Sequence, residues 1–525
     1  MRHRAIATFA LICLVLASRC VLAQEKPPAP LSPGRVAALD RISADSLRGH
    51  LSFLASDLLE GRDTPSRGLD LAAEYIAAQF RRAGLEAVGD DGYFQTANWE
   101  VSEPDRVSFD FRVVEGNATI KLGPDDVSVS GARTFHVEDA PLVKVDFKTY
   151  TTLNRAELAG KALLVELPIR EGTQEERDAI GLATGIFGSW AASAKAAAVI
   201  TIGRRAGTLK GLDSIFLYDP KDPETPERLA LREAPGAIPL ILVNVNAPEI
   251  IKLYDAHPVG PVPAKLSTKL DRPVRRPVKL RNVVGLLRGS DPALKDTCVM
   301  VTAHYDHLGV HGPADKPDRI YNGANDDGSG TVSVIELASA LASLKERPRR
   351  SILFVTFFGE EKGLLGSRYY GRNPIFPVDK TVADVNLELV GRTDDVEGPK
   401  LAEASLTGFG YSTVSTILAE AGRAEGVKVV RHPRNSDAFF GRSDNQALAD
   451  LGVPAHTLCV AFEYPDYHKA ADHWDKVDYA NMATIDRAVA RALLTIADDP
   501  DEPKWDESNP RAEAYLKAWK GRRGR

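Results

Sequence analysis

The sequence predicts an α/β fold, an α/β/α sandwich around a mixed, mainly parallel sheet, with an additional β-rich domain inserted into the chain. After Pro277, apolar runs alternate with helical stretches, as expected for a sheet with helices on both faces. These runs are almost continuously apolar, which is typical of strands buried on both sides. Between residues 131 and 272, short β-rich runs are separated by loops with Gly, Pro and charged residues, which indicates a different unit.

The individual elements follow from their periodicity. Leucines recur at three- and four-residue steps over residues 47–59, and 70–83 is a second amphipathic stretch, so we expect helices in both segments. Strands are expected at 106–114, 161–168, 196–203, 238–245, 282–287, 298–303, 351–358, 385–390 and 455–462. Further helices are expected at 330–345, 412–425 and 484–497.

The first residues have the layout of a secretory signal peptide. Arg2 and Arg4 precede the apolar run 5–17, and Val21-Leu22-Ala23 offers a small-residue cleavage site. We expect cleavage near Ala23 and a secreted or periplasmic protein. The apolar run is too short for a membrane span, which needs about 20 residues, and no second run is long enough. A lipid anchor at Cys20 is the alternative, for which Arg19 is a poor neighbour.

Charge and cysteine content exclude some classes of function. Lys and Arg number 66 and Asp and Glu 72, and loss of three arginines with the signal takes the net charge from −6 to −9. Without a basic excess we expect no nucleic-acid partner. Cys298 and Cys459 lie in apolar strand-like runs, where we expect buried thiols. An exported protein could instead join them in one disulfide.

Polar side chains follow the downstream ends of the predicted strands, where ligand sites of open α/β sheets form. They are His304, Asp306, Asp326, Glu360, Glu361, Glu388 and His468. Imidazole and carboxylate ligands together suit zinc, and a catalytic zinc site keeps one position open for water. The sequence therefore predicts a metal site at this edge of the sheet, with enough ligands for two divalent ions.

Each of these residues has a role that fits a two-metal site. Five of them supply ligands: His304, Asp326, Glu361, Glu388 and His468. Glu360 remains as a base, because its neighbour in sequence is a ligand. Asp306 lies two residues after His304 and can accept the other imidazole N–H, which would fix the tautomer of that ligand.

The motifs AHYDHLG, YNGANDDGSG, FFGEEKGLLGS, VNLELVGR and DYHKAAD resemble the five blocks of the co-catalytic zinc exopeptidases, metallopeptidase family twenty-eight. That family includes bacterial aminopeptidases and glutamate carboxypeptidase-like enzymes. The resemblance covers roughly residues 282–490, and 43–100 is similar to the family's N-terminal segment. It implies a phosphorylase/hydrolase-like fold with two zinc ions. Carried over by position, the bridging ligand is Asp326, the general acid/base is Glu360, and the remaining ligands are His304, Glu361, Glu388 and His468.

Two positions depart from the family's pattern. The fourth block usually has Asp, whereas this chain has Glu388, one methylene longer, which alters the geometry expected for one metal. In the last block a Thr-type residue usually follows Asp, whereas His473 follows Asp472 here. His473 is therefore a rival to His468 as a ligand.

The resemblance also predicts how the chain is divided. The runs LAGKALLVELP and SAKAAAVITIG are similar to a protease-associated domain, for which an unrelated β-rich lid is the alternative. The expected segments are a signal peptide (1–23), the N-terminal part of the peptidase domain with a linker (24–130), the inserted protease-associated-like domain (131–272), the zinc peptidase domain (273–500) and a charged C-terminal tail (501–525), frayed except for one terminal helix.

The implied function is an exported exopeptidase that hydrolyses terminal peptide bonds with a metal-activated water, with aminopeptidase as the first choice. Arg392, Arg434 and Arg442 keep a glutamate carboxypeptidase-like enzyme open, because a C-terminal carboxylate needs a cation. A single-zinc cyclase and a non-catalytic binding protein are alternatives on the same scaffold. A non-catalytic binding protein is disfavoured, because every ligand position has a side chain that can bind a metal.

Overall fold

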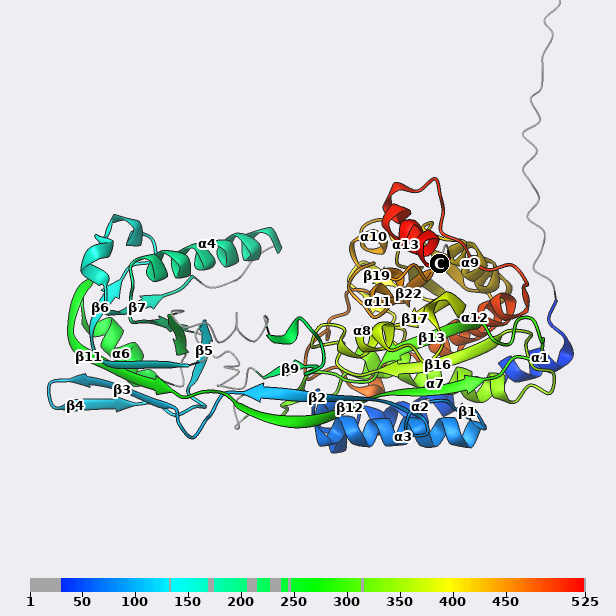
Figure 1. Cartoon of the computed structure of the whole chain (residues 1–525), viewed down its shortest axis with the longest axis horizontal. Helices are drawn as coiled ribbons and strands as arrows, with labels where there is room; N and C mark the ends of the chain where they lie inside the picture. Colours follow the sequence, from blue (N-terminus) through cyan, green and yellow to red (C-terminus); the bar gives the residue numbers. More distant parts are fainter. Residues whose placement is uncertain are drawn as a thin grey trace, which may run out of the picture.

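The computed structural model describes residues 30–131, 134–168, 174–204, 215–226, 238–243, 247–312 and 316–523. The predicted signal peptide, residues 1–23, lies outside this part of the chain. The strands form two large sheets, which Figure 1 shows in two lobes joined by long strands. Within the described ranges, no helix is long and apolar enough to cross a membrane.

The larger sheet has ten strands and is mixed, as predicted. Its strands are β1 (Glu86–Ala87), β2 (Phe94–Glu103), β9 (Phe216–Tyr218), β12 (Val274–Leu287), β13 (Cys298–His304), β16 (Ser351–Phe357), β17 (Thr381–Leu387), β20 (Glu403–Leu406), β21 (Lys428–Val430) and β22 (Ala455–Cys459). Their order is β21-β20-β22-β17-β13-β16-β12-β2-β9, with β1 paired to β12. The central strands β22, β17, β13 and β16 run parallel, whereas β12, β2 and β9 extend the sheet antiparallel. The carboxyl ends of the central strands therefore meet at one edge.

Helices cover both faces of this sheet, which gives the predicted α/β/α sandwich. The helices of one face are α1 (Pro33–Leu39), α2 (Ala44–Leu54), α3 (Arg67–Ala83), α7 (Gly330–Ala342), α9 (Val414–Ala424) and α12 (Tyr479–Asp498). Those of the other are α8 (Leu365–Arg372), α11 (Asn445–Ala449) and α13 (Glu513–Arg523). Side chains of β13 alternate between the layers: Val299 and Val301 pack in the first core, Cys298 and Met300 in the second.

The second lobe is an eight-stranded sheet with a separate hydrophobic core. Its strands are β3 (Asp110–Glu115), β4 (Ala118–Lys121), β5 (Val127–Gly131), β6 (Phe135–Val145), β7 (Ala162–Glu166), β8 (Ala198–Ile202), β10 (Pro239–Val243) and β11 (Gly260–Leu270), in the order β4-β3-β11-β6-β7-β8-β10-β5. It carries α4 (Gln174–Ser193) and α6 (Pro248–Ala256). The sheet begins at Asp110, before residue 131, and the division into domains remains a prediction.

The C-terminal segment differs from the frayed tail that its charge predicts. Trp505 and Ala512 are buried in the second core of the larger lobe, and the indole N–H of Trp505 donates a hydrogen bond to the Gly452 carbonyl at 3.0 Å. Tyr515 stacks on Trp505 with ring centroids 5.1 Å apart. The frayed tail is therefore wrong, because a few aromatic anchors outweigh the charged residues between them. The expected terminal helix is present as α13. Cys298 and Cys459 are buried free thiols, as expected.

The packing of α3 on the sheet gives a test of the fold. Phe80 is fully buried, with its ring centroid 6.4 Å from that of Phe354 on β16. We expect Phe80→Ala to lower the free energy of unfolding by about 3–5 kcal/mol, because it leaves a cavity between helix and sheet. Leu58, which is 78% exposed, is the control, and Leu58→Ala should stay within about 0.5 kcal/mol. Denaturant titration of both variants measures the difference, and equal losses would contradict this packing.

Candidate metal centre

The predicted ligands converge where the central strands end. His304 is the last residue of β13, the Glu360-Glu361 pair follows β16, and Glu388 follows β17. His468 lies in the loop beyond β22, and Asp326 lies in the turn that leads into α7. Parallel pairing of β13 with both β16 and β17 sets these ends next to one another. Residues up to 164 positions apart in the sequence thus share one site.

Asp326 lies at the centre of this cluster and faces two sets of ligand atoms. Its Oδ1 is 3.4 Å from His304 Nε2, and its Oδ2 is 3.0 Å from His468 Nε2. The ligand atoms of His304, Asp326 and Glu388 lie within 4.8 Å of one another. On the other side, Glu361 Oε1 is 3.5 Å from His468 Nε2. One carboxylate that presents its two oxygens to separate groups has the arrangement of a bridging ligand.

The chemistry of the donor set fits divalent cations. His304 Nε2 and Asp326 Oδ2 are buried, and among the described residues neither has a hydrogen-bond partner of good geometry. A buried polar atom left without a partner costs about 1–3 kcal/mol. Burial raises the pKa of Glu388 to about 7, and burial together with neighbouring carboxylates raises that of Glu360. A cation among these groups would offset both penalties, and nitrogen with oxygen donors suits zinc.

A third imidazole of the cluster, from His307, was missed by the sequence reasoning. Its side chain is fully buried, and its Nδ1 lies 2.8 Å from Glu361 Oε1 and 3.9 Å from Asp326 Oδ2. The ligand atoms of His307, Asp326 and Glu361 lie within 4.8 Å of one another. His307 is the second histidine of AHYDHLG, which was the signal available in the sequence. Its position would let it orient Glu361 or take the place of His468 as a ligand.

Asp306 contacts both His304 at the end of β13 and Glu360 in the loop after β16. Its Oδ1 accepts a hydrogen bond from the backbone N–H of Glu360 at 3.0 Å. The Nδ1 of His304 is nearer to the backbone carbonyl of Asp306, at 3.2 Å, than to its carboxylate, at 3.6 Å. The sequence predicts that the carboxylate holds this imidazole. In the structure the carbonyl is the closer acceptor, and the carboxylate holds the loop of Glu360.

The turn that carries Asp326 is held by buried groups on both sides. Asp472 Oδ2 accepts hydrogen bonds from the backbone N–H groups of Asn325 at 2.9 Å and Asp326 at 3.2 Å. Arg62 is buried and donates to four backbone carbonyls in the loops around the site: Leu54, Tyr305, Asn322 and Gly323. Sequence reasoning missed Arg62, because the apolar periodicity of that region predicts only helices.

The alternative metal ligand, His473, and two of the three arginines singled out by the sequence have other partners. His473 Nε2 is 3.3 Å from Asp318 Oδ2, and His473 belongs to neither ligand group. Arg392 is paired with Asp394 and Asp466, and Arg434 forms an ion pair with Glu397. Of the three arginines that the sequence singles out, Arg442 is the one that lines the cavity beside the cluster.

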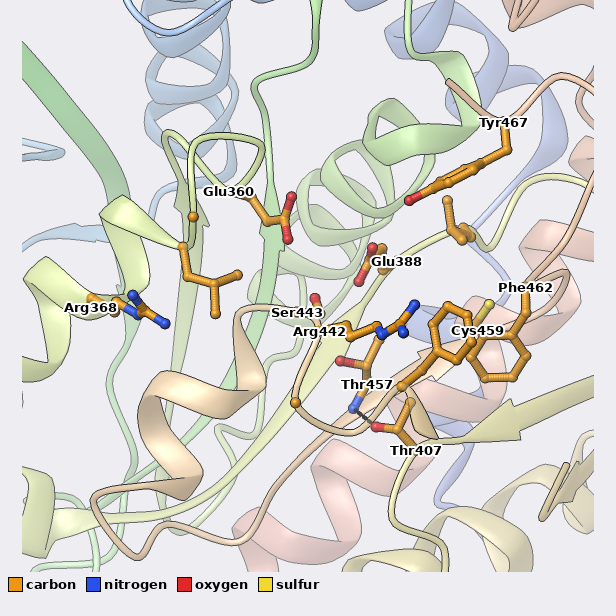
Figure 2. Close-up of a pocket in the computed structure, with 15 residues that line it drawn as sticks. Glu360, Arg368, Glu388, Thr407, Arg442, Ser443, Thr457, Cys459, Phe462 and Tyr467 are labelled. Atoms are coloured by element: carbon orange, nitrogen blue, oxygen red, sulfur yellow. Dashed lines mark hydrogen bonds between the residues drawn. The ribbon is translucent and has the colours of Figure 1, made fainter. Parts of the chain in front are cut away.

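A cavity of about 410 Å³ opens next to the metal ligands (Figure 2). Glu360 and Glu388 form part of its wall, so a molecule bound there would touch both the predicted base and a predicted ligand. Apolar side chains line much of the remainder, among them Leu364, Phe439 and Phe462. A small molecule with an apolar part fits this lining.

The chain is similar to known proteins over part of its length. Residues 282–493 match the sequence model of Peptidase family M28. Aminopeptidase Y of Saccharomyces cerevisiae is 25% identical over 241 residues, which are 42% of this chain and 40% of the yeast protein. A protein named "Probable zinc metalloprotease" from Pyricularia oryzae is 36% identical over 212 residues, 38% of this chain and 39% of the fungal one. The chain thus spans less than half the length of both relatives.

The fold is also similar to that of a zinc aminopeptidase from Bacillus subtilis. The TM-score is 0.55 at 19% sequence identity, over 90% of this chain and 97% of the other. At that identity the likeness concerns the fold, which includes the mixed sheet with its covering helices. The family match covers four of the central strands, their connecting helices and every predicted ligand. Through residues 282–493, therefore, the chain matches peptidase family M28.

Proposed function

We propose that the protein is a zinc-dependent exopeptidase that uses two zinc ions and releases residues from a peptide's amino end. The observation that carries the proposal is Asp326, whose oxygens face His304 on one side and His468 on the other. The match of residues 282–493 to a peptidase family supports hydrolysis of peptide bonds. The names of the yeast and Bacillus proteins support the aminopeptidase class and zinc.

We assign the following ligand and catalytic roles to residues of the chain. One zinc would be held by His304, Asp326 and Glu388, and the other by Asp326, Glu361 and His468. When bound, such a pair supplies an acidified water and polarises the scissile carbonyl. Glu360 then accepts the proton of the attacking water on its carboxylate and donates it to the leaving amine nitrogen. Asp306 keeps Glu360 in place through the backbone N–H of that residue.

We further propose that the protein is exported and that the second lobe is a protease-associated-like domain. The layout of residues 1–23 supports export, because a charged start, a short apolar run and a small-residue exit are typical of signal peptides. The central β6-β7-β8 pairing of the second lobe, which is parallel, supports a domain with a fold and core of its own.

A glutamate carboxypeptidase-like enzyme is the second candidate, because Arg442 lines the cavity beside the metal ligands. A panel of peptides blocked at either end separates the two candidates. An aminopeptidase cleaves a peptide with an amidated carboxyl end and leaves an N-acetylated one intact, and a carboxypeptidase does the reverse.

The purified mature chain should bind about two zinc ions per monomer. We expect a chelator to abolish hydrolysis and added zinc to restore it, because the water lacks activation without the metal. Elemental analysis and initial rates are measured on the same samples. Hydrolysis that persists in a metal-free sample would end the proposal.

Glu360→Gln should keep both zinc ions while kcat falls by about 10²–10⁴-fold, because the amide preserves size but cannot accept a proton. Glu361→Gln is the matched change one residue along, and it should lower metal occupancy, since a neutral amide is a poorer ligand than a carboxylate. Zinc content and kcat distinguish the two variants. If Glu360→Gln lost zinc as readily as Glu361→Gln, the assigned roles would be wrong.

His468→Ala should lose one zinc and nearly all activity, whereas His473→Ala should keep both. The reason is position: His468 faces Asp326 and Glu361, and His473 faces Asp318. His307→Ala, measured in the same series, shows whether this buried imidazole is a ligand. Loss of zinc from His307→Ala, with zinc retained by His468→Ala, would move the ligand role to His307.

A further inference from the structure

A second cavity, of about 320 Å³, lies between strand β9 and helix α8. In sequence, β9 belongs to the second lobe, because it lies between β8 and β10, which pair with each other in the eight-stranded sheet. It nevertheless pairs with β2 of the larger sheet, with Phe216 opposite Ser102 and Tyr218 opposite Glu100. Figure 1 shows β9 beside β2, between the two lobes. A segment that the second lobe extends to the larger lobe therefore forms one wall of this cavity.

Strand β9 is firmly attached to the larger lobe. Leu217 is buried in the first core of that lobe, and the hydroxyl of Tyr218 donates a hydrogen bond to the Glu100 carboxylate. Beyond the strand, Asp222 forms an ion pair with Arg372 of α8, with 3.7 Å between Oδ2 and Nη1. The wall is thus a fixed surface, and a ligand that binds to it pays little for ordering the chain.

The second cavity adjoins the metal site through the loop that carries Glu360. Lys362, two residues after Glu360, lines the second cavity, and Arg368 lines both this cavity and the one beside the metal ligands. In Figure 2, Arg368 lies on one side of Glu360 and Arg442 on the other. An extended peptide rises about 3.3 Å per residue, so a peptide that crosses Glu360 reaches the second cavity within about two or three residues.

The cationic side chains of the lining already lie close to carboxylates. The groups are Lys362 with Asp63, Arg372 with Asp222, and Arg368 with Asp444 and Asp450. Charge is therefore a minor part of what this lining offers to a ligand, and its aromatic and apolar groups matter more.

A hydrogen-bond donor in the lining lacks an acceptor. Trp99 is 4% exposed, and among the described residues its indole N–H has no hydrogen-bond partner. Edge contacts with Phe358 and Tyr369, at centroid distances of 5.7 and 6.1 Å, fix the orientation of the ring. A buried N–H without an acceptor is unfavourable, and a carbonyl of a bound peptide would remove that cost. Phe216 and Leu365 add apolar contact to the same lining.

We propose that the second cavity binds the part of a peptide substrate that lies about two or three residues beyond the cleaved bond. There Trp99 donates to a main-chain carbonyl of the peptide, and Phe216 contacts an apolar or aromatic side chain. The proposal rests on the proposed function, since it names the substrate class of the same site, which is peptides of about four residues or more. The second lobe then takes part in substrate selection through β9.

Amidated peptides of different length test this cavity without a charged carboxyl end. The series is Leu-Gly-amide, Leu-Gly-Gly-Gly-amide and Leu-Gly-Phe-Phe-amide, and the initial release of leucine by the zinc-loaded protein is measured. We expect kcat/KM to rise along the series, by about tenfold or more from the first peptide to the last, as one hydrogen bond and one buried aromatic side chain allow. Equal values for the three peptides would overturn the proposal.

Two substitutions test the residues, through the ratio of kcat/KM for Leu-Gly-Phe-Phe-amide to that for Leu-Gly-amide. This ratio cancels any change in the fraction of folded enzyme. Phe216→Ala removes the aromatic contact and Trp99→Phe removes the N–H but keeps a ring, so we expect each to lower the ratio by about threefold or more. Phe147→Ala is the matched control, because Phe147 is a half-buried aromatic residue of the second lobe outside the cavity lining, and it should keep the ratio.

A lower ratio in either variant, with the ratio kept by the control, supports the proposal. The proposal is wrong if Phe216→Ala and Trp99→Phe both keep the ratio, or if Phe147→Ala lowers it as much as they do.

Calorimetry on zinc-loaded Glu360→Gln protein needs no turnover and separates failure of this cavity from failure of the peptidase. We expect Leu-Gly-Phe-Phe-amide to bind about tenfold more tightly than Leu-Gly-amide, and Phe216→Ala in the same protein to reduce that difference. If no peptide is cleaved but the difference is present, the proposed function fails and the binding cavity stands. If peptides are cleaved and the difference is absent, the assignment of the cavity fails alone.

Discussion

The site depends on one electrostatic constraint: several carboxylates are buried close together at the end of a parallel sheet. Asp326, Glu360, Glu361 and Glu388 repel one another there, and burial removes the water that would screen them. Imidazoles offset part of this repulsion, as the contacts of Asp326 with His304 and His468 show. The remainder is the energetic reason why the cluster favours cations, and it explains why so many neighbouring groups serve to hold the loops.

The supporting groups work on the backbone more than on the ligands themselves. Arg62 donates to carbonyls on three separate segments, and Asp472 accepts from the backbone N–H groups of Asn325 and Asp326. Burial lowers the pKa of Arg62 to about 10, against the attraction of nearby carboxylates, and it stays protonated at neutral pH. A fixed cation and fixed loops resist the repulsion of the ligand carboxylates, so the ligand positions are set before a metal binds.

Most of the sequence prediction rests on hydrophobic periodicity and on the position of polar residues after the predicted strands. Strands β13, β16, β17 and β22 and helices α7, α9 and α12 were predictable, because continuous apolar runs in alternation with helices have few other solutions. The short elements β20, β21, α8 and α11 of the same region were not predicted. The placement of the predicted ligands at one edge follows from the parallel pairing. His307 and Arg62 were not predictable in this way, because neither ends a strand and their importance depends on contacts across the fold. The C-terminal anchors and α4 were missed because charge and loop-like composition obscured their apolar residues.

The arrangement of the ligands also explains why the domain needs its full sheet. The ligands follow β13, β16, β17 and β22, which are far apart in the sequence. The site therefore cannot form in a local fragment. Each ligand contributes only when β13, β16, β17 and the loop after β22 are in register. Metal affinity would then be coupled to folding of the whole larger lobe, since a cation would bind the native arrangement and not the separated segments. Because the site needs long-range strand pairing, a strand shifted in register would displace a ligand and would also lose the hydrogen bonds of the strand. This coupling favours the native register.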